Sequence, residues 1–178
     1  MKIEPSSRLS YAMMSVADAD LFYQLDQDEE VMRYINGGIK TSREHLNTVL
    51  LPRLESYRNV DEGWGLWKVS ITSNNEFIGW ILVRPMNFFS DSPELDNLEL
   101  GWRFSRKSWG KGFATEAASS FKEAIVKENK VSKISAIAIK ENIASINIME
   151  KMGMIYLKTA LHEAPLGEQE VVYYGLDI

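Results

Sequence analysis

The fold is decided by the stretch LELGWRF at residues 98–104, followed by SRKSWGKG to residue 112 and FATEAASSF to residue 121. Apolar or aromatic residues stand at every second position of the first part, which predicts a β-strand. Phe113, Ala117 and Phe121 recur at helical spacing, which predicts a helix. Gly110 and Gly112 lie between the two parts. We therefore expect a strand that passes through a glycine-containing turn into a helix.

The composition of this turn is typical of an anion site. A helix N-terminus exposes unpaired N–H groups and the positive end of the helix dipole, and glycines let the backbone approach a bulky anion closely. The order of the glycines is not that of a P-loop, because Phe113 follows Gly112. It is not the dinucleotide fingerprint either, because Thr115 stands where the third glycine is required. The turn predicts a site for a phosphate or pyrophosphate.

The string from Trp109 to Ala117 resembles motif A of the GNAT N-acetyltransferases, and in particular the branch of the ribosomal-protein N-terminal acetyltransferases RimJ and RimL. A second match, Asn142-Ile143-Ala144-Ser145 followed by MEKMGM at residues 149–154, resembles motif B of the same family. In that family the turn amides bind the pyrophosphate of acetyl-CoA, and the motif-B asparagine lies beside the pantetheine arm. The resemblance implies an acetyl-CoA-dependent N-acetyltransferase.

The resemblance also implies the fold class: α/β (α+β), with a mixed, mostly antiparallel, V-shaped sheet of six or seven strands flanked by helices, in one domain spanning residues 1–178. The cofactor of that fold lies where the fourth and fifth strands separate. From the residues themselves we expect the unit at 98–139 to pair its two strands in parallel through a right-handed crossover. Local signals predict a helix N-cap at Ser15, a capping box from Thr41 to Glu44, a helix break at Pro52 and a bulge or close backbone approach at Gly79.

The composition limits the possible classes of protein. The chain has 178 residues, a hydrophobic fraction of 45%, a charged fraction of 25% and no cysteine. The absence of cysteine excludes disulfides, thiolate metal sites and a cysteine nucleophile, and we expect no metal cofactor. A net charge of −5 argues against a nucleic-acid partner and is compatible with a cationic substrate. Because no apolar run of about 18 residues is present, we expect no membrane association and a cytoplasmic location. We expect the chain to be a monomer or a homodimer.

The resemblance carries a set of cofactor contacts onto this sequence. They come from the strand, the turn and motif B: Trp102, Phe104, Lys107, Ser108, Trp109, Gly110, Lys111, Gly112, Phe113, Ala114, Asn142, Ser145 and Asn147. A backbone N–H near Trp102 or Phe104 would stabilise the oxyanion. Asn142 is equally well explained as a helix N-cap, and Asn147 as part of a solvated helix face. Trp109 is more readily interpreted as an anchor of the turn than as a substrate contact.

Acetyl transfer to an amine requires a base to remove a proton from the amine. Glu99 is the first candidate, because the alternation of the strand places it on the face opposite Leu98 and Leu100. The other interpretation is an ion pair with Arg103 on the same face. Glu116 is less suitable, because it lies in the first turns of a helix, where the dipole already favours a carboxylate.

For the acid that protonates the leaving thiolate, the sequence offers several alternatives. Many members of the family have a tyrosine seven residues after the motif-B asparagine, but this chain has Met149, which has no proton to donate. Ser145, Tyr156 and Tyr173 are alternatives, and the thiolate can also leave without an acid.

The acceptor is expected at Tyr34, Asn36 and Gly37 and at the loop of residues 162–168. The branch resemblance favours a protein N-terminal amine, followed by a small amine such as a polyamine or an antibiotic. A non-catalytic acyl-CoA-binding sensor is the alternative from another class, because of Met149. Without a cysteine to carry the acyl group, we expect direct transfer in a ternary complex.

Overall fold

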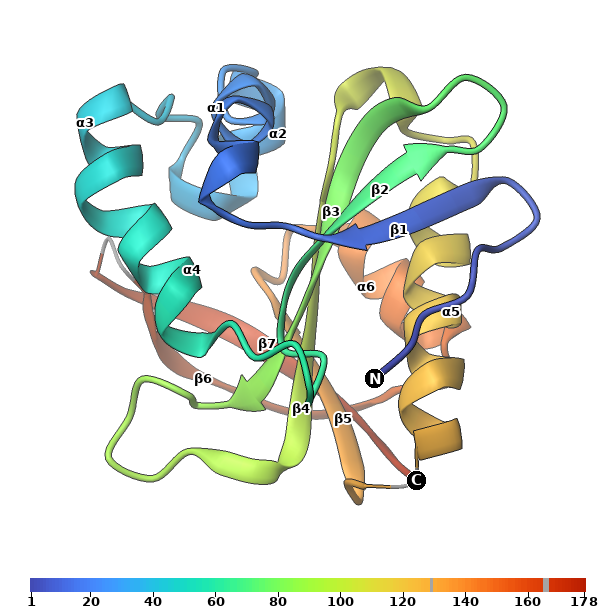
Figure 1. The fold of residues 1–178 in the computed structure, drawn as a ribbon. Coiled ribbons are helices and arrows are strands. Elements are labelled where there is room, and N and C mark those ends of the chain that lie inside the picture. Colours follow the sequence, from blue (N-terminus) through green and yellow to red (C-terminus); the bar gives the residue numbers. More distant parts are fainter. Residues whose placement is uncertain (129, 165–166) are drawn as a thin grey trace.

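The computed structural model describes residues 1–128, 130–164 and 167–178, which form one seven-stranded sheet flanked by helices (Figure 1). The strand order is β1-β2-β3-β4-β5-β7-β6, and each neighbouring pair is antiparallel apart from the parallel pair β4–β5. The strands are β1 (Leu9–Met13), β2 (Gly65–Ile71), β3 (Glu76–Met86), β4 (Glu94–Phe104), β5 (Lys133–Ala138), β6 (Ile155–Ala164) and β7 (Gly167–Asp177). The predicted fold class, including the parallel crossover, is confirmed.

Helices cover both faces of the sheet (Figure 1). The two C-terminal helices, α5 (Phe113–Glu128) and α6 (Ile143–Lys151), pack on one face. The other face is covered by the short helices α1 (Ala19–Leu25), α2 (Glu29–Asn36), α3 (Arg43–His45) and α4 (Leu51–Tyr57). The site residues predicted from the sequence therefore come from helices on both faces of the sheet, as well as from the sheet itself.

Alternation along the central strands separates the side chains into two cores. Ile81 of β3 and Leu100 of β4 pack with Phe121 of α5 in the larger core. Trp80 of β3 packs with Leu54 of α4 in the smaller core, which lies under the N-terminal helices. Because successive strand residues point to opposite faces, the odd-numbered residues of β4 are directed toward the N-terminal helices.

Most local signals at the helix ends are confirmed. The Ser15 hydroxyl accepts a hydrogen bond from the Ala17 N–H at 3.2 Å, and the Ser15 N–H donates to Asp18. Helix α2 ends at Gly37, which adopts a left-handed φ of 79°. Near Pro52 the helical segment changes geometry, because a π-helical turn at Leu46–Leu50 precedes α4. Proline has no N–H to donate, so a regular helical hydrogen-bond pattern cannot pass through it unchanged.

The predicted capping box at Thr41 is wrong. Ser42 is the N-cap instead, because its hydroxyl accepts the His45 N–H at 3.0 Å. The Thr41 hydroxyl donates to the Asp26 carboxylate at 2.7 Å. Asp26 is completely buried, and a buried carboxylate requires hydrogen-bond donors, which explains why Thr41 is used there.

Gly79 marks a bulge and a close backbone approach, as predicted. The register between β2 and β3 shifts opposite this residue, and its φ is 155°. A Cβ at Gly79 would lie 2.3 Å from the carbonyl oxygen of Arg103 on β4. The glycine therefore allows β3 to approach β4 beside the part of β4 that carries the predicted site.

We expect Gly79→Ala to lower the free energy of unfolding by about 2–4 kcal/mol, because it combines an unfavourable φ with a clash against backbone. Gly37→Ala is the matched control: its φ is also positive, but its Cβ would meet nothing within 4 Å. The control should cost only about 1 kcal/mol. Equal losses in urea unfolding of the two variants would contradict the role of the close approach.

Candidate active site

The site begins where β4 and β5 separate. Their parallel pairing joins Asn97 to Lys133, Leu98 to Ile134 and Glu99 to Ser135. Beyond Glu99, β4 continues to Phe104, and its pairing with β5 does not extend along that part. The second half of β4 thus borders a gap in the sheet, which is the place where the sequence resemblance puts the cofactor.

A cavity of about 470 Å³ extends from this gap to the glycine-containing turn. Its lining residues come from four parts of the chain: the N-terminal helix α2, strand β4, the turn with the start of α5, and α6. They include most of the predicted cofactor contacts, namely Trp102, Phe104, Ser108, Trp109, Gly110, Gly112, Phe113, Ala114, Asn142, Ser145 and Asn147. The structure therefore brings these residues together around one hollow.

The turn that closes one end of the cavity consists of a short 3₁₀ segment, Arg106–Ser108, followed by the two glycines. Gly110 and Gly112 have φ values of 71° and 77°, in the left-handed region that favours glycine. A Cβ at Gly110 would meet no protein atom within 4 Å, so a ligand can approach its backbone. Since α5 starts at Phe113, its unpaired N–H groups lie next to the cavity.

Trp109 anchors the turn, as predicted, and its indole Nε1 donates to the carbonyl oxygen of Phe104 at 2.8 Å. The two predicted lysine contacts behave differently from the rest of the set. Lys107 and Lys111 are not among the lining residues, and Lys107 forms an ion pair with Glu76. The positive character of the turn at the cavity therefore comes mainly from backbone N–H groups and the helix dipole.

Helix α6 forms the opposite wall of the gap. Asn142 is its N-cap and accepts the Ser145 N–H at 3.2 Å, so the capping interpretation holds while the residue also lines the cavity. The Ser145 hydroxyl oxygen accepts a hydrogen bond from the Trp102 indole Nε1 at 3.2 Å, which joins α6 to β4 across the gap. A hydroxyl that accepts one bond retains its own O–H to donate.

Met149, at the position of the usual tyrosine, is a residue of the core. It is only 1% exposed and belongs to the larger hydrophobic cluster. Among the alternative acids, the Tyr156 hydroxyl contacts Thr159 at 2.9 Å, and the Tyr173 hydroxyl contacts His162 Nδ1 at 3.1 Å. Neither tyrosine lines the cavity. Burial, followed by the nearby charge of Glu99, raises the pKa of Tyr173, so this phenol stays protonated at neutral pH.

Glu99 lies at the apex of the gap, in the last residue pair shared by β4 and β5. It is 5% exposed and faces the N-terminal helices, as the alternation predicted. Its Oε2 accepts a hydrogen bond from Arg84 Nε of β3 at 2.8 Å. Tyr57 of α4 is close to this pair, and burial raises its pKa to about 12.

The predicted pairing of Glu99 with Arg103 is wrong. Arg103 pairs with Asp26, at 2.5 Å between Nη1 and Oδ1, and its guanidinium lies over the Trp80 ring. Asp26 comes from the end of α1, a position that the β4 sequence cannot reveal. Because it also accepts a hydrogen bond from Thr41, this buried carboxylate fixes β4 to the N-terminal helices.

Several lining residues were missed by the sequence analysis. Glu30, Val31 and Ile35 come from α2, and Thr115, Ala144, Ile148 and Lys151 come from the helices on the other side. Lys151 had a usable signal, because it is four residues after Asn147 and so lies on the same face of α6. Glu30, Val31 and Ile35 had none beyond their closeness in sequence to Tyr34, which was predicted as an acceptor contact.

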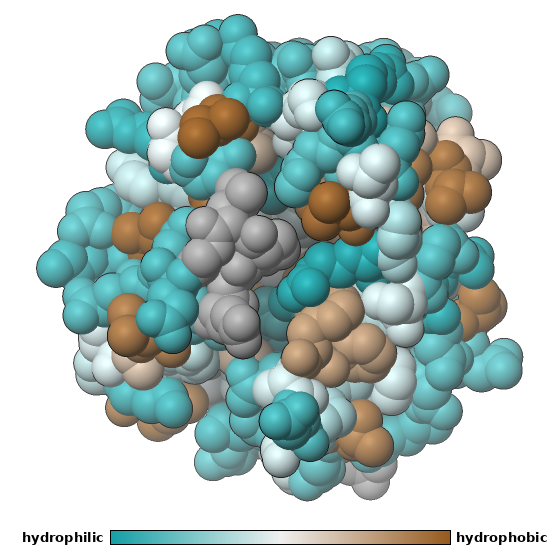
Figure 2. Space-filling view, turned by 90° about the vertical axis from the view of Figure 1, so that its left-hand side faces the viewer, coloured by the Kyte–Doolittle hydropathy of each residue, from teal (hydrophilic) through white to brown (hydrophobic). Residues whose placement is uncertain are grey.

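Of the predicted acceptor contacts, Tyr34 lines the cavity, whereas Asn36 and Gly37 do not. The Asn36 side chain instead closes the turn after α2 through two hydrogen bonds with Ile39, at 2.8 and 3.0 Å. The predicted loop at 162–168 is too long, because β6 extends to Ala164 and β7 begins at Gly167. Residues 165 and 166 lie outside the described residues. The side of the molecule formed by α3 and α4 is largely hydrophilic, with hydrophobic residues in separate patches (Figure 2).

Neither a metal site nor a membrane span is found in the parts of the chain that the structure describes. No group of three or more His, Cys, Asp or Glu residues could hold a metal ion among them. No helix among them is long and apolar enough to cross a membrane.

Comparisons with known proteins agree with this geometry. A family described as "Acetyltransferase (GNAT) domain" matches residues 8–155, which is most of the chain. The protein YkkB of Bacillus subtilis (strain 168) is 32% identical over 145 residues, which cover 79% of this chain and 77% of YkkB.

Solved structures show the same fold. A GNAT-family acetyltransferase from Bacillus anthracis has a TM-score of 0.75 and 24% identity, covering 99% of this chain and 98% of its own. The aminoglycoside acetyltransferase AAC(6')-Ib, solved with coenzyme A and kanamycin, has a TM-score of 0.75 and 16% identity, covering 95% and 94% of the two chains. Since the family match spans the strand, turn and helices that build the cavity, the chain belongs to the GNAT family and is an acetyl-CoA-dependent acetyltransferase.

Proposed function

We propose that the chain transfers the acetyl group of acetyl-CoA directly to a primary amine, with the pyrophosphate on the turn at Gly110 and Gly112 and the pantetheine arm in the gap between β4 and α6. The cavity carries this proposal, because it joins the glycine-containing turn to the gap. An arm that follows it would bring the thioester toward the apex of the gap, near Glu99. Direct transfer agrees with a chain that has no cysteine to hold an acyl group.

Glu99 is the proposed base. It lies next to the point where the two strands separate, and Arg84 Nε donates to its Oε2 at 2.8 Å. A carboxylate has several acceptor positions, so this one contact leaves Glu99 able to accept a proton. Because Glu99 does not line the cavity, the proton reaches it through water that enters with the acceptor.

Ser145 is proposed to position the arm rather than to act as an acid. Its contact with Trp102 places the hydroxyl at the gap. A CoA thiolate is also a good leaving group near neutral pH, because its thiol has a pKa of about 8.5 by analogy with cysteine. The buried Met149 at the usual tyrosine position is therefore compatible with catalysis.

The proposed acceptor is a protein N-terminal amine. The sequence from Trp109 to Ala117, which resembles that of the RimJ and RimL branch, supports this choice. Glu30 and Tyr34, which line the cavity, add a carboxylate and a hydroxyl that can contact an ammonium group before deprotonation. A small polycationic amine is the second candidate, because AAC(6')-Ib, with the same fold, is solved with kanamycin.

A panel of amines tests the acceptor. Thiol release from acetyl-CoA should be measured with short peptides that have free N-termini, with the same peptides N-terminally blocked, and with spermidine and kanamycin. We expect kcat/KM to be at least about tenfold higher for a free peptide than for either small amine. A preference for spermidine or kanamycin would support the second candidate, and release that is independent of any amine would contradict transfer.

The position of the cofactor is tested at Gly110. Gly110→Asp places a negative charge beside the pyrophosphate and should weaken CoA binding by roughly 2–4 kcal/mol, measured by calorimetry. Gly110→Asn is the matched control, because asparagine has the same size, tolerates a left-handed φ and has no charge. The Gly110→Asn variant should lose much less CoA affinity than Gly110→Asp. Unchanged CoA affinity in a folded Gly110→Asp variant would exclude this site.

The base is tested by comparing Glu99→Gln with Ser145→Ala. We expect Glu99→Gln to retain CoA affinity and to lower kcat by about two to four orders of magnitude. Ser145→Ala should instead raise the KM for acetyl-CoA with kcat nearly unchanged. Near-normal turnover of Glu99→Gln would leave Glu99 as a structural partner of Arg84, and a large kcat loss in Ser145→Ala would identify the serine as the acid.

A further inference from the structure

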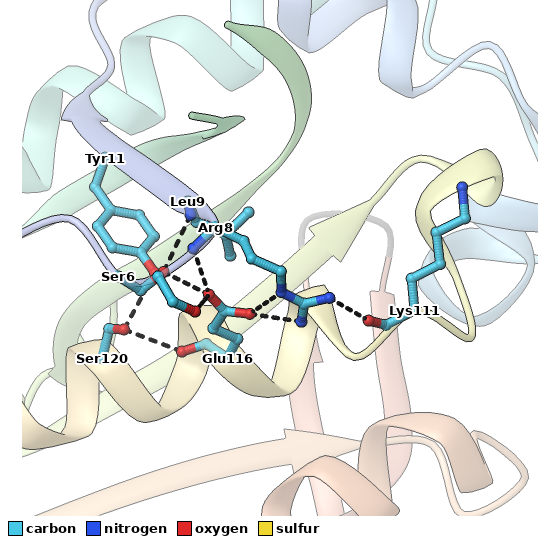
Figure 3. A network of polar contacts seen from close by, with 8 residues as sticks. Ser6, Arg8, Leu9, Tyr11, Lys111, Glu116 and Ser120 are labelled. Carbon is cyan, nitrogen blue, oxygen red and sulfur yellow. Dashed lines mark hydrogen bonds and ion pairs between the residues drawn. The ribbon is translucent and has the colours of Figure 1, made fainter. Parts of the chain in front are cut away.

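Arg8, the residue directly before β1, reaches the glycine-containing turn with its side chain (Figure 3). Its Nη1 donates to the carbonyl oxygen of Lys111, in the middle of the turn, at 3.0 Å. Its guanidinium also lies over the ring of Phe113, the first residue of α5, with 4.5 Å from Cζ to the ring centroid. Arg8 does not line the cavity, so its influence on a ligand there is indirect.

Glu116 holds Arg8 in this position. Its Oε2 accepts Arg8 Nε at 2.6 Å and pairs with Nη2 at 2.5 Å, while Oε1 accepts the Arg8 backbone N–H at 3.0 Å and the Ser6 hydroxyl at 2.7 Å (Figure 3). Burial would raise the pKa of the Glu116 carboxyl, but the hydrogen bonds from Ser6, Arg8 and Ser7 lower it below its ordinary value. Glu116 therefore stays ionised, and the arginine fork has a fixed partner on one side.

The bond from Arg8 to Lys111 fixes the orientation of a peptide group. The peptide between Lys111 and Gly112 is planar and trans, so its C=O and N–H point in opposite directions. Because Arg8 holds the carbonyl oxygen, the Gly112 N–H points away from Arg8. Gly112 lines the cavity, whereas Lys111 does not. The same contact thus presents this N–H on the side of the ligand.

The turn itself does not determine this orientation. Gly112 is glycine, and glycine accepts positive and negative φ about equally well. Rotation of the peptide between Lys111 and Gly112 is therefore inexpensive for the backbone alone, and it would replace the N–H at the cavity with a carbonyl oxygen, which repels an anion. An external contact is needed to favour one orientation.

The positive charge of Arg8 also favours the binding of an anion at the turn. Glu116 lies in the first turn of α5, at the helix end whose positive potential favours an anion. An unpaired carboxylate there would oppose a pyrophosphate. The bidentate contact with Arg8 offsets the Glu116 charge next to the turn.

We propose that Arg8 is a positioning residue for the acetyl donor: paired with Glu116, it locks the Lys111–Gly112 peptide so that the turn presents its N–H to the pyrophosphate. This inference rests on the proposed cofactor position. In this role, a residue next to β1 that is far from the turn in sequence contributes to the affinity for the acetyl donor.

The test uses two donors on the full chain. S-acetylpantetheine has the same thioester as acetyl-CoA but no pyrophosphate. We expect Arg8→Met to raise the Kd and KM of acetyl-CoA about tenfold with kcat kept, while kcat/KM for S-acetylpantetheine changes less than about twofold. Arg8→Lys should lie between the wild type and Arg8→Met, because one ammonium group cannot reproduce the bidentate fork and the carbonyl contact together.

Tyr11→Phe is the matched control. It removes another hydrogen bond between the same two elements, from the Tyr11 hydroxyl to Ser120 at 3.1 Å, at a distance from the turn. It should leave the acetyl-CoA affinity unchanged. If Arg8→Met proves unstable, Arg8→Lys supplies the same comparison.

The proposal is overturned if the Arg8 variants bind acetyl-CoA like the wild type, or if Tyr11→Phe weakens acetyl-CoA binding as much as Arg8→Met does. It is also overturned if Arg8→Met lowers kcat/KM equally for acetyl-CoA and S-acetylpantetheine. A wild-type chain that does not bind acetyl-CoA would instead refute the proposed function. A wild-type chain that binds it and loses affinity upon Gly110→Asp, but not upon Arg8→Met, would refute only the role of Arg8.

Discussion

The short parallel contact between β4 and β5 is the constraint on which the site depends. Three residue pairs join the strands, and beyond them the second half of β4 borders the gap. The crossover that connects the two strands must pass over one face of the sheet, and α5 does so with its N-terminus next to the end of β4. The topology of the sheet therefore places the turn and α6 around one cavity at the gap, independently of individual side-chain contacts.

The local parts of this arrangement could be predicted from the sequence. The strand, the glycine-containing turn and the start of α5 at Phe113 have short-range signals, because alternation, helical spacing and positive φ are properties of neighbouring residues. The Asn142 cap and the face of Glu99 follow from equally local rules. The family resemblance extended these signals to the fold class, which the structure and the comparisons confirm.

The partners of the charged residues could not be predicted in the same way. Arg103 was a reasonable partner for Glu99 within one strand, but the pairing of β3 with β4 supplies Arg84, and the end of α1 supplies Asp26 to Arg103. Such contacts depend on register and on helix packing, which are set by residues far apart in the chain. The same reason explains why Tyr34 was the only residue of α2 correctly expected at the cavity, and why Lys107 and Lys111 were predicted as cofactor contacts although neither lines the cavity. A lysine near a turn in sequence can pair elsewhere, as Lys107 does with Glu76.

The position of β7 in the strand order has a consequence for biosynthesis. β7 lies between β5 and β6, although it follows every other strand in the chain. During translation, β5 therefore emerges with one edge unpaired, and it keeps this open edge until β7 has been made and inserted beside it. An unpaired edge can associate with other chains while it is exposed. Completion of the half-sheet that carries α6 thus follows the synthesis of all the other described strands, and the nascent domain has the turn of its donor site well before it has the opposite wall in place.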